Sequence, residues 1–208
     1  MSEWPFGTLE RNSFGCISVD PPWHFRARTA LQSRNFQSAR DVEKHYSTMC
    51  LDDIKALPVG DLATPYCHLW MWITGPMLVE GNHIPLMKAW GFKPSSLAFT
   101  WAKLKRSFDV NQLRTLPTLA GAFHTGLGLT TRKACEFVVL GRRPKSMRVA
   151  KNVRELILAP VRQHSRKPDE FYDRVRAYCE GPYLELFARE SRPGWSTWGD
   201  ESGLFDEK

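Results

Sequence analysis

Apolar runs alternate along the chain with segments of helical periodicity, and this alternation predicts the elements of the fold. Buried strands are expected where apolar residues follow one another or recur with period two, at residues 14–19, 67–73, 92–101, 134–140, 155–159, 183–188 and 195–198. Helices are expected at 51–57, at 77–90 with a kink or interruption at Pro85, and at 168–179. Strands that alternate with helices indicate an α/β domain, a mostly parallel twisted sheet with helices on both faces.

Two long segments lack a clear period. Residues 24–46 form a polar and basic loop after the first strand, and residues 103–132 are rich in glycine and threonine. Loops of this length in a compact domain usually carry function. The chain shows no internal repeat and no Pro/Gly/Ser-rich linker, so we expect a single domain over residues 1–208.

The composition suits a folded domain in a reducing compartment. Of 208 residues, 42% are hydrophobic and eight are tryptophan, which is enough apolar material for a full core. The longest apolar run, 69–73, is too short to cross a bilayer, and the start of the chain has neither the basic head nor the apolar stretch of a signal peptide. Five cysteines without a CxxC pair favour reduced thiols in the cytoplasm over a disulfide frame or a zinc ribbon.

Positive charge is concentrated in three stretches. The formal net charge is +7, but residues 24–46, 102–133 and 142–154 carry +3, +5 and +6, so the rest of the chain is at −7. Each stretch flanks a predicted strand end. We therefore expect all three to surround the carboxyl ends of the strands and to form a surface for nucleic acid.

The tetrapeptide Asp20-Pro21-Pro22-Trp23 follows the first predicted strand. Ligands of open α/β sheets bind beyond the carboxyl ends of the strands. Because the two prolines make a stiff turn, they would hold the Asp20 carboxylate and the Pro21 carbonyl pointing the same way. Two neighbouring acceptors match an exocyclic NH2 group, whose lone pair they help to free for attack. Trp23 would offer a flat face on which a flipped-out base stacks.

The tetrapeptide resembles the signature of the MT-A70 family of adenine-N6 methyltransferases, which use S-adenosylmethionine. Further segments are similar to motifs of that family, in the family's order and over about residues 14–201. These are HYSTM at 45–49, HLWMWIT at 68–74, TWAK at 100–103, HSRKPDE at 164–170, YLELFAR at 183–189 and WSTWG at 195–199.

The resemblance implies a Rossmann-like methyltransferase fold with a circularly permuted motif order, in which the catalytic motif comes first and the cofactor-binding strand comes near the end. It accounts for the lack of a GxGxxG motif after the first strand. The block of catalytic residues is then Asp20, Pro21, Pro22 and Trp23, with Asp20 also near the cofactor's charge. No separate target-recognition domain is expected.

The resemblance also implies roles for residues elsewhere in the chain. Tyr46 would line the pocket of the target base. Lys103 and Arg132 belong to the basic stretch 102–133, a candidate recognition loop, and are expected to bind substrate. Residues near the cofactor are Lys167 for the methionine carboxylate, Arg189 for the ribose hydroxyls, and Glu185, Phe187, Asp200 and Glu201.

Two positions depart from the family pattern. Asp200 and Glu201 stand where members often have Asn-Gln, and a carboxylate cannot donate a hydrogen bond to adenine as an amide can. Ser191 stands where a relative often has His or Asn, so no contact is assigned to it.

Other chemistries lack their motifs. The six histidines form no HExxH or HxH pattern, and neither GxSxG nor a phosphate-binding GxxxxGK[ST] loop occurs. No metal is expected, because direct methyl transfer to nitrogen needs positioning, charge and exclusion of water.

Alternatives remain within the nucleic-acid class. The first hypothesis is an active adenine-N6 methyltransferase acting on DNA in a bacterial or phage-infected cell, because compact members of this kind look bacterial or phage-borne. The second is an RNA adenine-N6 methyltransferase, and the third is a non-catalytic, nucleic-acid-binding partner subunit, although such subunits have lost the acidic tetrapeptide kept here. N4-cytosine methylation is a weaker rival, and a homodimer or a partner subunit is left open.

Overall fold

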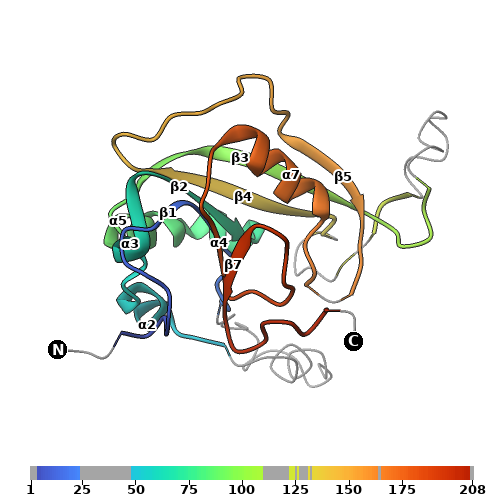
Figure 1. The fold of residues 1–208 in the computed structure, drawn as a ribbon. Coiled ribbons are helices and arrows are strands. Elements are labelled where there is room, and N and C mark those ends of the chain that lie inside the picture. Colours follow the sequence, from blue (N-terminus) through green and yellow to red (C-terminus); the bar gives the residue numbers. More distant parts are fainter. Residues whose placement is uncertain are drawn as a thin grey trace, which may run out of the picture.

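One sheet forms the centre of the molecule. The computed structural model describes residues 4–23, 48–109, 122–124, 126, 131, 133–163 and 165–206. In this part of the chain, seven strands pair in the order β5-β3-β4-β2-β1-β6-β7 (Figure 1). Their bounds are β1 Phe14–Val19, β2 Ala63–Ile73, β3 Lys93–Leu104, β4 Cys135–Arg142, β5 Leu156–Pro160, β6 Tyr183–Leu186 and β7 Trp195–Trp198. Within this described sheet only β4 pairs antiparallel with its neighbours, so the expected mostly parallel α/β sheet is confirmed.

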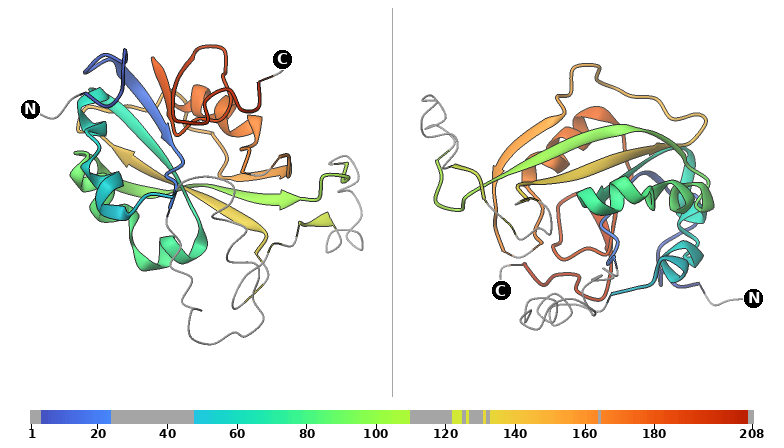
Figure 2. Two further views of the ribbon diagram at one scale, coloured as in Figure 1. Left: turned by 90° about the horizontal axis from the view of Figure 1, so that it is seen from below. Right: turned by 180° about the vertical axis from the view of Figure 1, so that it is seen from behind.

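Helices cover both faces of the sheet. On one face lie α2 (Leu51–Ala56), α3 (Val59–Leu62), α4 (Gly75–Glu80) and α5 (His83–Ala89), and on the other lies α7 (Asp169–Tyr178) (Figures 1 and 2). Strands covered on both sides must be apolar on both sides, and every residue of β1 is indeed buried. None of the helices within the described residues is long and apolar enough to span a bilayer.

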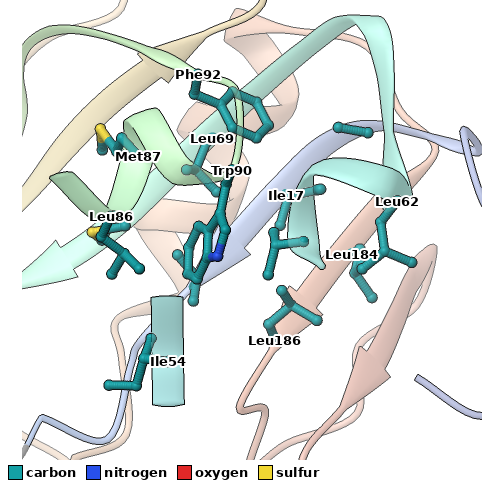
Figure 3. Packing of buried hydrophobic residues seen from close by; sticks show 14 of the residues in the cluster. Ile17, Ile54, Leu62, Leu69, Leu86, Met87, Trp90, Phe92, Leu184 and Leu186 are labelled. Atoms are coloured by element: carbon teal, nitrogen blue, oxygen red, sulfur yellow. The ribbon is translucent and has the colours of Figure 1, made fainter. Parts of the chain in front are cut away.

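Two apolar clusters hold the layers together. In the first, aliphatic side chains of β1, β2 and β6 meet residues of α2 and α5, and Figure 3 shows Ile17, Leu69 and Leu186 close to Ile54 and Trp90. The second is aromatic and fixes α7 to the opposite face. There the Phe171 ring lies 4.8 Å from the Trp72 ring and 5.9 Å from that of Phe99.

The segment expected as one helix at 77–90 is two helices. The chain breaks at Gly81, whose φ of 73° lies in the left-handed region, and the Gly81 N–H closes α4 on the Leu78 carbonyl at 3.1 Å. The expected interruption at Pro85 is wrong because Pro85 lies in the first turn of α5, where a missing N–H costs no hydrogen bond.

The order of the strands creates a crevice between β1 and β6. From β1 the chain builds the sheet outward in one direction through β2, and β6 and β7 later extend it in the other. Ligands of open α/β sheets bind at such a switch point, beyond the carboxyl ends of the strands. Val19 of β1 pairs with Leu186 of β6, so Asp20 and Phe187 leave the sheet side by side.

One of the three basic stretches lies elsewhere than expected. Because β4 runs against its neighbours, it begins at the edge that carries Asp20 and ends at the opposite edge. Residues 142–154 follow β4 and begin at that opposite edge, so the expectation that the whole stretch surrounds the carboxyl ends of the strands is wrong. Its last residues return toward β5, whose Leu156 pairs with Thr100. Residues 24–46 and part of 102–133 lie outside the described residues.

Candidate active site

The Asp-Pro-Pro-Trp turn is fixed at both ends. The Pro21 carbonyl accepts the Trp23 N–H at 2.7 Å, and the Pro22 carbonyl accepts the Met49 N–H at 3.0 Å. The Trp23 side chain is buried in the apolar core, and its Nε1 donates to the Trp72 carbonyl at 3.4 Å. The expectation that Trp23 offers a face to a base is therefore not met in this structure, since the core holds that face. The ring anchors the turn instead.

A chain of alternating charges begins at Asp20. Lys167 Nζ lies 3.0 Å from Asp20 Oδ2 and 2.8 Å from Glu136 Oε2, and Lys103 pairs with the other oxygen of Glu136. The Lys167 side chain is only 7% exposed and its ammonium lies 4.9 Å from the centre of the Trp72 ring. Four segments of the chain thus bring two lysines and two carboxylates together at the edge of the sheet that carries Asp20.

The charged neighbours of Lys167 and Glu136 determine the ionisation of these two side chains. Burial lowers the pKa of Lys167, but Asp20 and Glu136 outweigh burial and raise that pKa above its usual value. Burial raises the pKa of Glu136, but Lys167 and Lys103 outweigh it and lower that pKa to about 2. Lys167 and Glu136 are therefore held in their charged forms.

A second buried carboxyl lies beside Asp20. Glu185, near the end of β6, is 7% exposed, and its Oε1 accepts the Tyr172 hydroxyl at 2.6 Å. Its Oε2 is buried and has no hydrogen-bond partner among the described residues. Burial raises the pKa of Glu185 to about 7, and the charge of Asp20 adds to that rise. An oxygen buried in this way is costly unless a ligand donates to it.

A tight turn ends β6 and directs the chain around the crevice. Phe187 has φ 58°, a left-handed conformation that is uncommon for a residue other than glycine. Gly199, after β7, lies so close that a Cβ there would be 2.9 Å from the Phe187 Cα. The Ala188 N–H donates to the Trp198 carbonyl at 3.0 Å. The close approach of β7 therefore holds the strained turn in place.

These groups line one pocket at the switch point. Its walls come from the ends of β1 and β6, from the segment before α7 and from the C-terminal segment, and consist of Asp20, Ser165, Arg166, Lys167, Tyr172, Glu185, Phe187, Arg189, Glu190 and Phe205. Arg166 and Arg192 pair with Glu190, and Arg192 also pairs with Asp169 at 2.6 Å. The pocket thus presents a carboxylate, an ammonium, a partly protonated carboxyl and a guanidinium within one crevice.

Comparison with known proteins identifies the family of this chain. The family model MT-A70 matches residues 14–201, which is most of the chain. The chain belongs to the MT-A70 family. As an MT-A70 protein it is similar to the Type II methyltransferase M.MunI of a Mycoplasma species, with 30% identity over 209 residues, 94% of this chain and 81% of that protein.

Other relatives of this MT-A70 chain are longer proteins. The chain is 26% identical over 210 residues to the human N(6)-adenine-specific methyltransferase METTL4, across 92% of this chain and 38% of METTL4. It is 30% identical over 200 residues to the N6-methyladenosine RNA methyltransferase MTA1 of Cryphonectria parasitica, across 93% of this chain and 53% of MTA1. It therefore spans about four fifths of the first relative and about half or less of these two.

The pocket of this MT-A70 chain contains part of the residue set expected from the sequence. Five of those residues line the pocket: Asp20, Lys167, Glu185, Phe187 and Arg189. Lys103 joins the chain of charges through Glu136, whereas Pro21, Pro22, Trp23, Asp200 and Glu201 do not line the pocket. Tyr46 and Arg132 lie outside the described residues.

The departures at Asp200 and Glu201 differ in their surroundings. Glu201 Oε2 lies 2.8 Å from Arg189 Nε, so an acid at this position has a cationic neighbour. Asp200 is exposed.

Sequence reasoning missed Glu136, which the structure places between two lysines. The signal in the sequence was one acidic residue within residues 134–141, ACEFVVLG, a segment whose other residues suit a buried strand. It also missed Tyr172 and Arg192, which look from the sequence like ordinary positions of an amphipathic helix and a loop.

A larger groove of about 610 Å³ lies at the opposite edge of the sheet, but each of its charged side chains already has a partner. Arg143 Nη2 donates to the carbonyls of Gly60 at 2.6 Å and Trp90 at 3.2 Å, and Arg11 pairs with Asp61. No group of three or more His, Cys, Asp or Glu residues in the described part of the chain has an arrangement that could hold a metal ion. The switch-point pocket is therefore the candidate active site.

Proposed function

We propose that this protein transfers a methyl group from S-adenosylmethionine to N6 of adenine in a nucleic acid. The observation that carries the proposal is Asp20, held by Lys167 at the switch point of an MT-A70 chain. Relatives support the substrate class, since their names describe N6-adenine and N6-methyladenosine RNA methyltransferases. We favour DNA, because compact members of this kind look bacterial or phage-borne and the chain covers 81% of a Type II methyltransferase of a Mycoplasma species.

The Asp-Pro-Pro-Trp turn supplies the acceptors for the target amine. Lys167 engages Oδ2 of Asp20, and we assign Oδ1 to one amine hydrogen. The Pro21 carbonyl already accepts one N–H, but an oxygen has two lone pairs and can accept a second hydrogen from the amine. Two acceptors bind both N–H groups of the amine and thereby orient and polarise it. Its lone pair is then more available for attack. We assign to Asp20 the proton that the nitrogen then sheds.

The pocket residues fit the proposed cofactor. When bound, S-adenosylmethionine supplies a methyl group on a positively charged sulfur, which becomes a neutral thioether after transfer. Of the three N–H donors of Lys167, two reach Asp20 and Glu136, and we assign the third to the methionine carboxylate. The buried Oε2 of Glu185 fits a cationic donor such as the methionine ammonium. Arg189 is assigned to the ribose hydroxyls.

The proposal includes a circularly permuted arrangement of the methyltransferase fold. The strand that carries Asp20 is the first of the chain, and the strand that ends at the cofactor pocket is β6, near the C-terminal end. We place the reaction in the cytoplasm of a bacterial or phage-infected cell. The support is that all five cysteines of the chain are free, with no disulfide among them.

The test is methylation by the purified protein, followed by digestion of the product to nucleosides. Single-stranded DNA, duplex DNA and RNA are each incubated with S-adenosylmethionine labelled in its methyl group. We expect N6-methyldeoxyadenosine, and Asp20→Asn should lower kcat by about 10²-fold or more, as loss of a preorganised polar contact does. Equal urea unfolding of Asp20→Asn and the wild type is the control for folding.

Each other outcome supports a rival. Methylcytosine in the product would show that the methylated base is cytosine and not adenine. N6-methyladenosine from RNA alone would show that the substrate is RNA and not DNA. Nucleic-acid binding without transfer and without measurable S-adenosylmethionine binding would show a partner subunit. Full turnover by Asp20→Asn would remove Asp20 from the mechanism.

A further inference from the structure

The segment after β4 is strongly basic and exposed. Residues 142–154 contain six Lys or Arg residues and no acid. All but one of the six are exposed, namely Arg142, Lys145, Arg148, Lys151 and Arg154. The first three of these, Arg142, Lys145 and Arg148, lie at the edge of the sheet opposite Asp20, and we call them together with Tyr66 the far basic surface. Figure 1 shows the chain running along the top of the sheet between β4 and β5.

The far basic surface has a fixed shape. The Arg143 N–H donates to the Cys67 carbonyl at 3.0 Å, and the Lys145 N–H donates to the Pro65 carbonyl at 3.2 Å. Further along, the Val149 N–H donates to the Tyr178 carbonyl at 2.7 Å. Backbone bonds to β2 and to the end of α7 thus pin the segment at three points. Charges on a pinned backbone present themselves without the entropic cost of ordering a loop.

Aromatic and apolar side chains lie among the charges. Tyr66 is 57% exposed, and Lys145 Nζ lies 6.0 Å from the centre of its ring. Met147 and Val149 are also largely exposed, at 78% and 61%. A cationic surface interleaved with an exposed ring matches nucleic acid, which offers phosphates for the cations and bases for stacking.

The distance to the active site can be taken from the strands. Met71 pairs with Val19, the residue before Asp20, and Tyr66 lies five positions earlier in β2. At about 3.3 Å per residue, five residues span about 17 Å. The ten residues of α7, which begins beside Lys167 and ends at Tyr178 near the surface, span about 15 Å. Both estimates agree.

We propose that the far basic surface binds phosphates of the same nucleic acid, about five or more nucleotides away from the target base. This rests on the proposed function and names an anchoring site for the flanking strand. The separation follows from about 17 Å at about 3.4 Å per nucleotide, the spacing along one strand of a duplex. The far basic surface cannot touch the target nucleotide, so it acts on affinity for long substrates and leaves the chemical step unchanged.

The test compares two double variants with equal charge change. Lys145→Gln/Arg148→Gln removes two exposed cations from the far basic surface, and Lys55→Gln/Lys88→Gln removes two exposed lysines of α2 and α5. Substrates are a single-stranded 5-mer with adenine in the centre and a 25-mer with the same central sequence. Fluorescence anisotropy measures binding of the 25-mer at 50 and 200 mM salt, and methylation gives KM and kcat for both.

For the 25-mer we expect the surface variant to bind more weakly and with less salt dependence. Loss of two phosphate contacts lowers the salt slope by about 1.4 and raises KM about five- to ten-fold at low salt. The 5-mer cannot reach the surface and should keep its KM, and the control variant should resemble the wild type on both substrates.

Several results would overturn the proposal. An unchanged 25-mer affinity would exclude nucleic acid from the surface, and capture of an acidic protein by the wild type but not by the surface variant would then assign the surface to that partner. Equal loss on both substrates would show damage to the active site. If the wild type methylates nothing, the proposed function fails, but the anisotropy experiment still decides whether the surface binds nucleic acid.

Discussion

Glutamine in place of Glu136 tests the chain of charges at the active site. Glu136 lies between the ammonium groups of Lys167 and Lys103, and its side chain is 19% exposed. Glu136→Gln keeps the volume of the side chain and removes its negative charge. Lys167 then keeps only the carboxylate of Asp20 as its partner in the chain of charges, and Lys103 loses the carboxylate of Glu136. We expect a less stable protein with weaker cofactor binding, because the ammonium of Lys167 is no longer held from both sides.

The magnitude follows from the pKa of Glu136. The two lysines lower that pKa from 4.5 to about 2. At about 1.4 kcal/mol per pKa unit, this shift corresponds to about 3 kcal/mol of unfolding free energy at neutral pH. Since the pKa is lower in the folded state, the contribution is fully present above pH 4.5 and is lost as the pH falls toward 2. At pH 3 about 1 kcal/mol remains.

Urea unfolding at pH 7 and pH 3 is the assay. At pH 7 the midpoint of Glu136→Gln should fall by about 1 to 2 M, given an m value near 2 kcal/mol per M. At pH 3 the difference from the wild type should shrink to a fraction of that. Glu10→Gln, at an exposed glutamate, is the control and should change the unfolding free energy by less than about 0.5 kcal/mol. A difference that stays constant with pH, or one below that of the control, would refute the reasoning.

Two further predictions concern the pocket walls. The pKa of Glu185 is about 7, so a cationic cofactor, which favours its carboxylate, should release part of a proton on binding and bind more tightly as the pH rises from 6 to 8. Calorimetry in buffers of different ionisation enthalpy measures this release, which Glu185→Gln should abolish; release that persists would assign the proton elsewhere. Gly199→Ala would place a Cβ 2.9 Å from the Phe187 Cα, so thermal unfolding should show a loss of about 1–3 kcal/mol, and unchanged stability would mean that the turn yields freely.

The central strands could be predicted from the sequence because they are buried on both faces. The apolar run at residues 14–19 is fully buried and coincides with β1, whereas residues 195–198 alternate apolar and polar and coincide with β7, whose Ser196 is exposed. Direction was not readable, since the reversal of β4 depends on its pairing with β2 and β3. The same reversal displaced residues 142–154 from the expected edge, and the left-handed turn at Phe187 ended β6 two residues early.

Site residues that lie within short motifs could be predicted from the sequence, whereas residues whose role depends on distant parts of the chain could not. Asp20 and Lys167 sit in short distinctive segments, which the resemblance to a family could assign. Glu136 has meaning only through two lysines, 31 and 33 positions away in the chain. Trp23 was misread because a tryptophan beside a catalytic turn fits a stacking role and an anchoring role equally well until its burial is known.

The direction of β4 has a consequence for redesign. One end of this strand places Glu136 beside Lys167 and Lys103, and the far basic surface begins at its other end, so one strand connects the two. The connection that follows Arg142 can therefore be replaced by longer or differently charged segments without entering the pocket. Such replacements would change where the substrate strand is bound and leave the residues of the pocket unchanged. An insertion within β4 itself would instead shift its register and turn Glu136 away from both lysines.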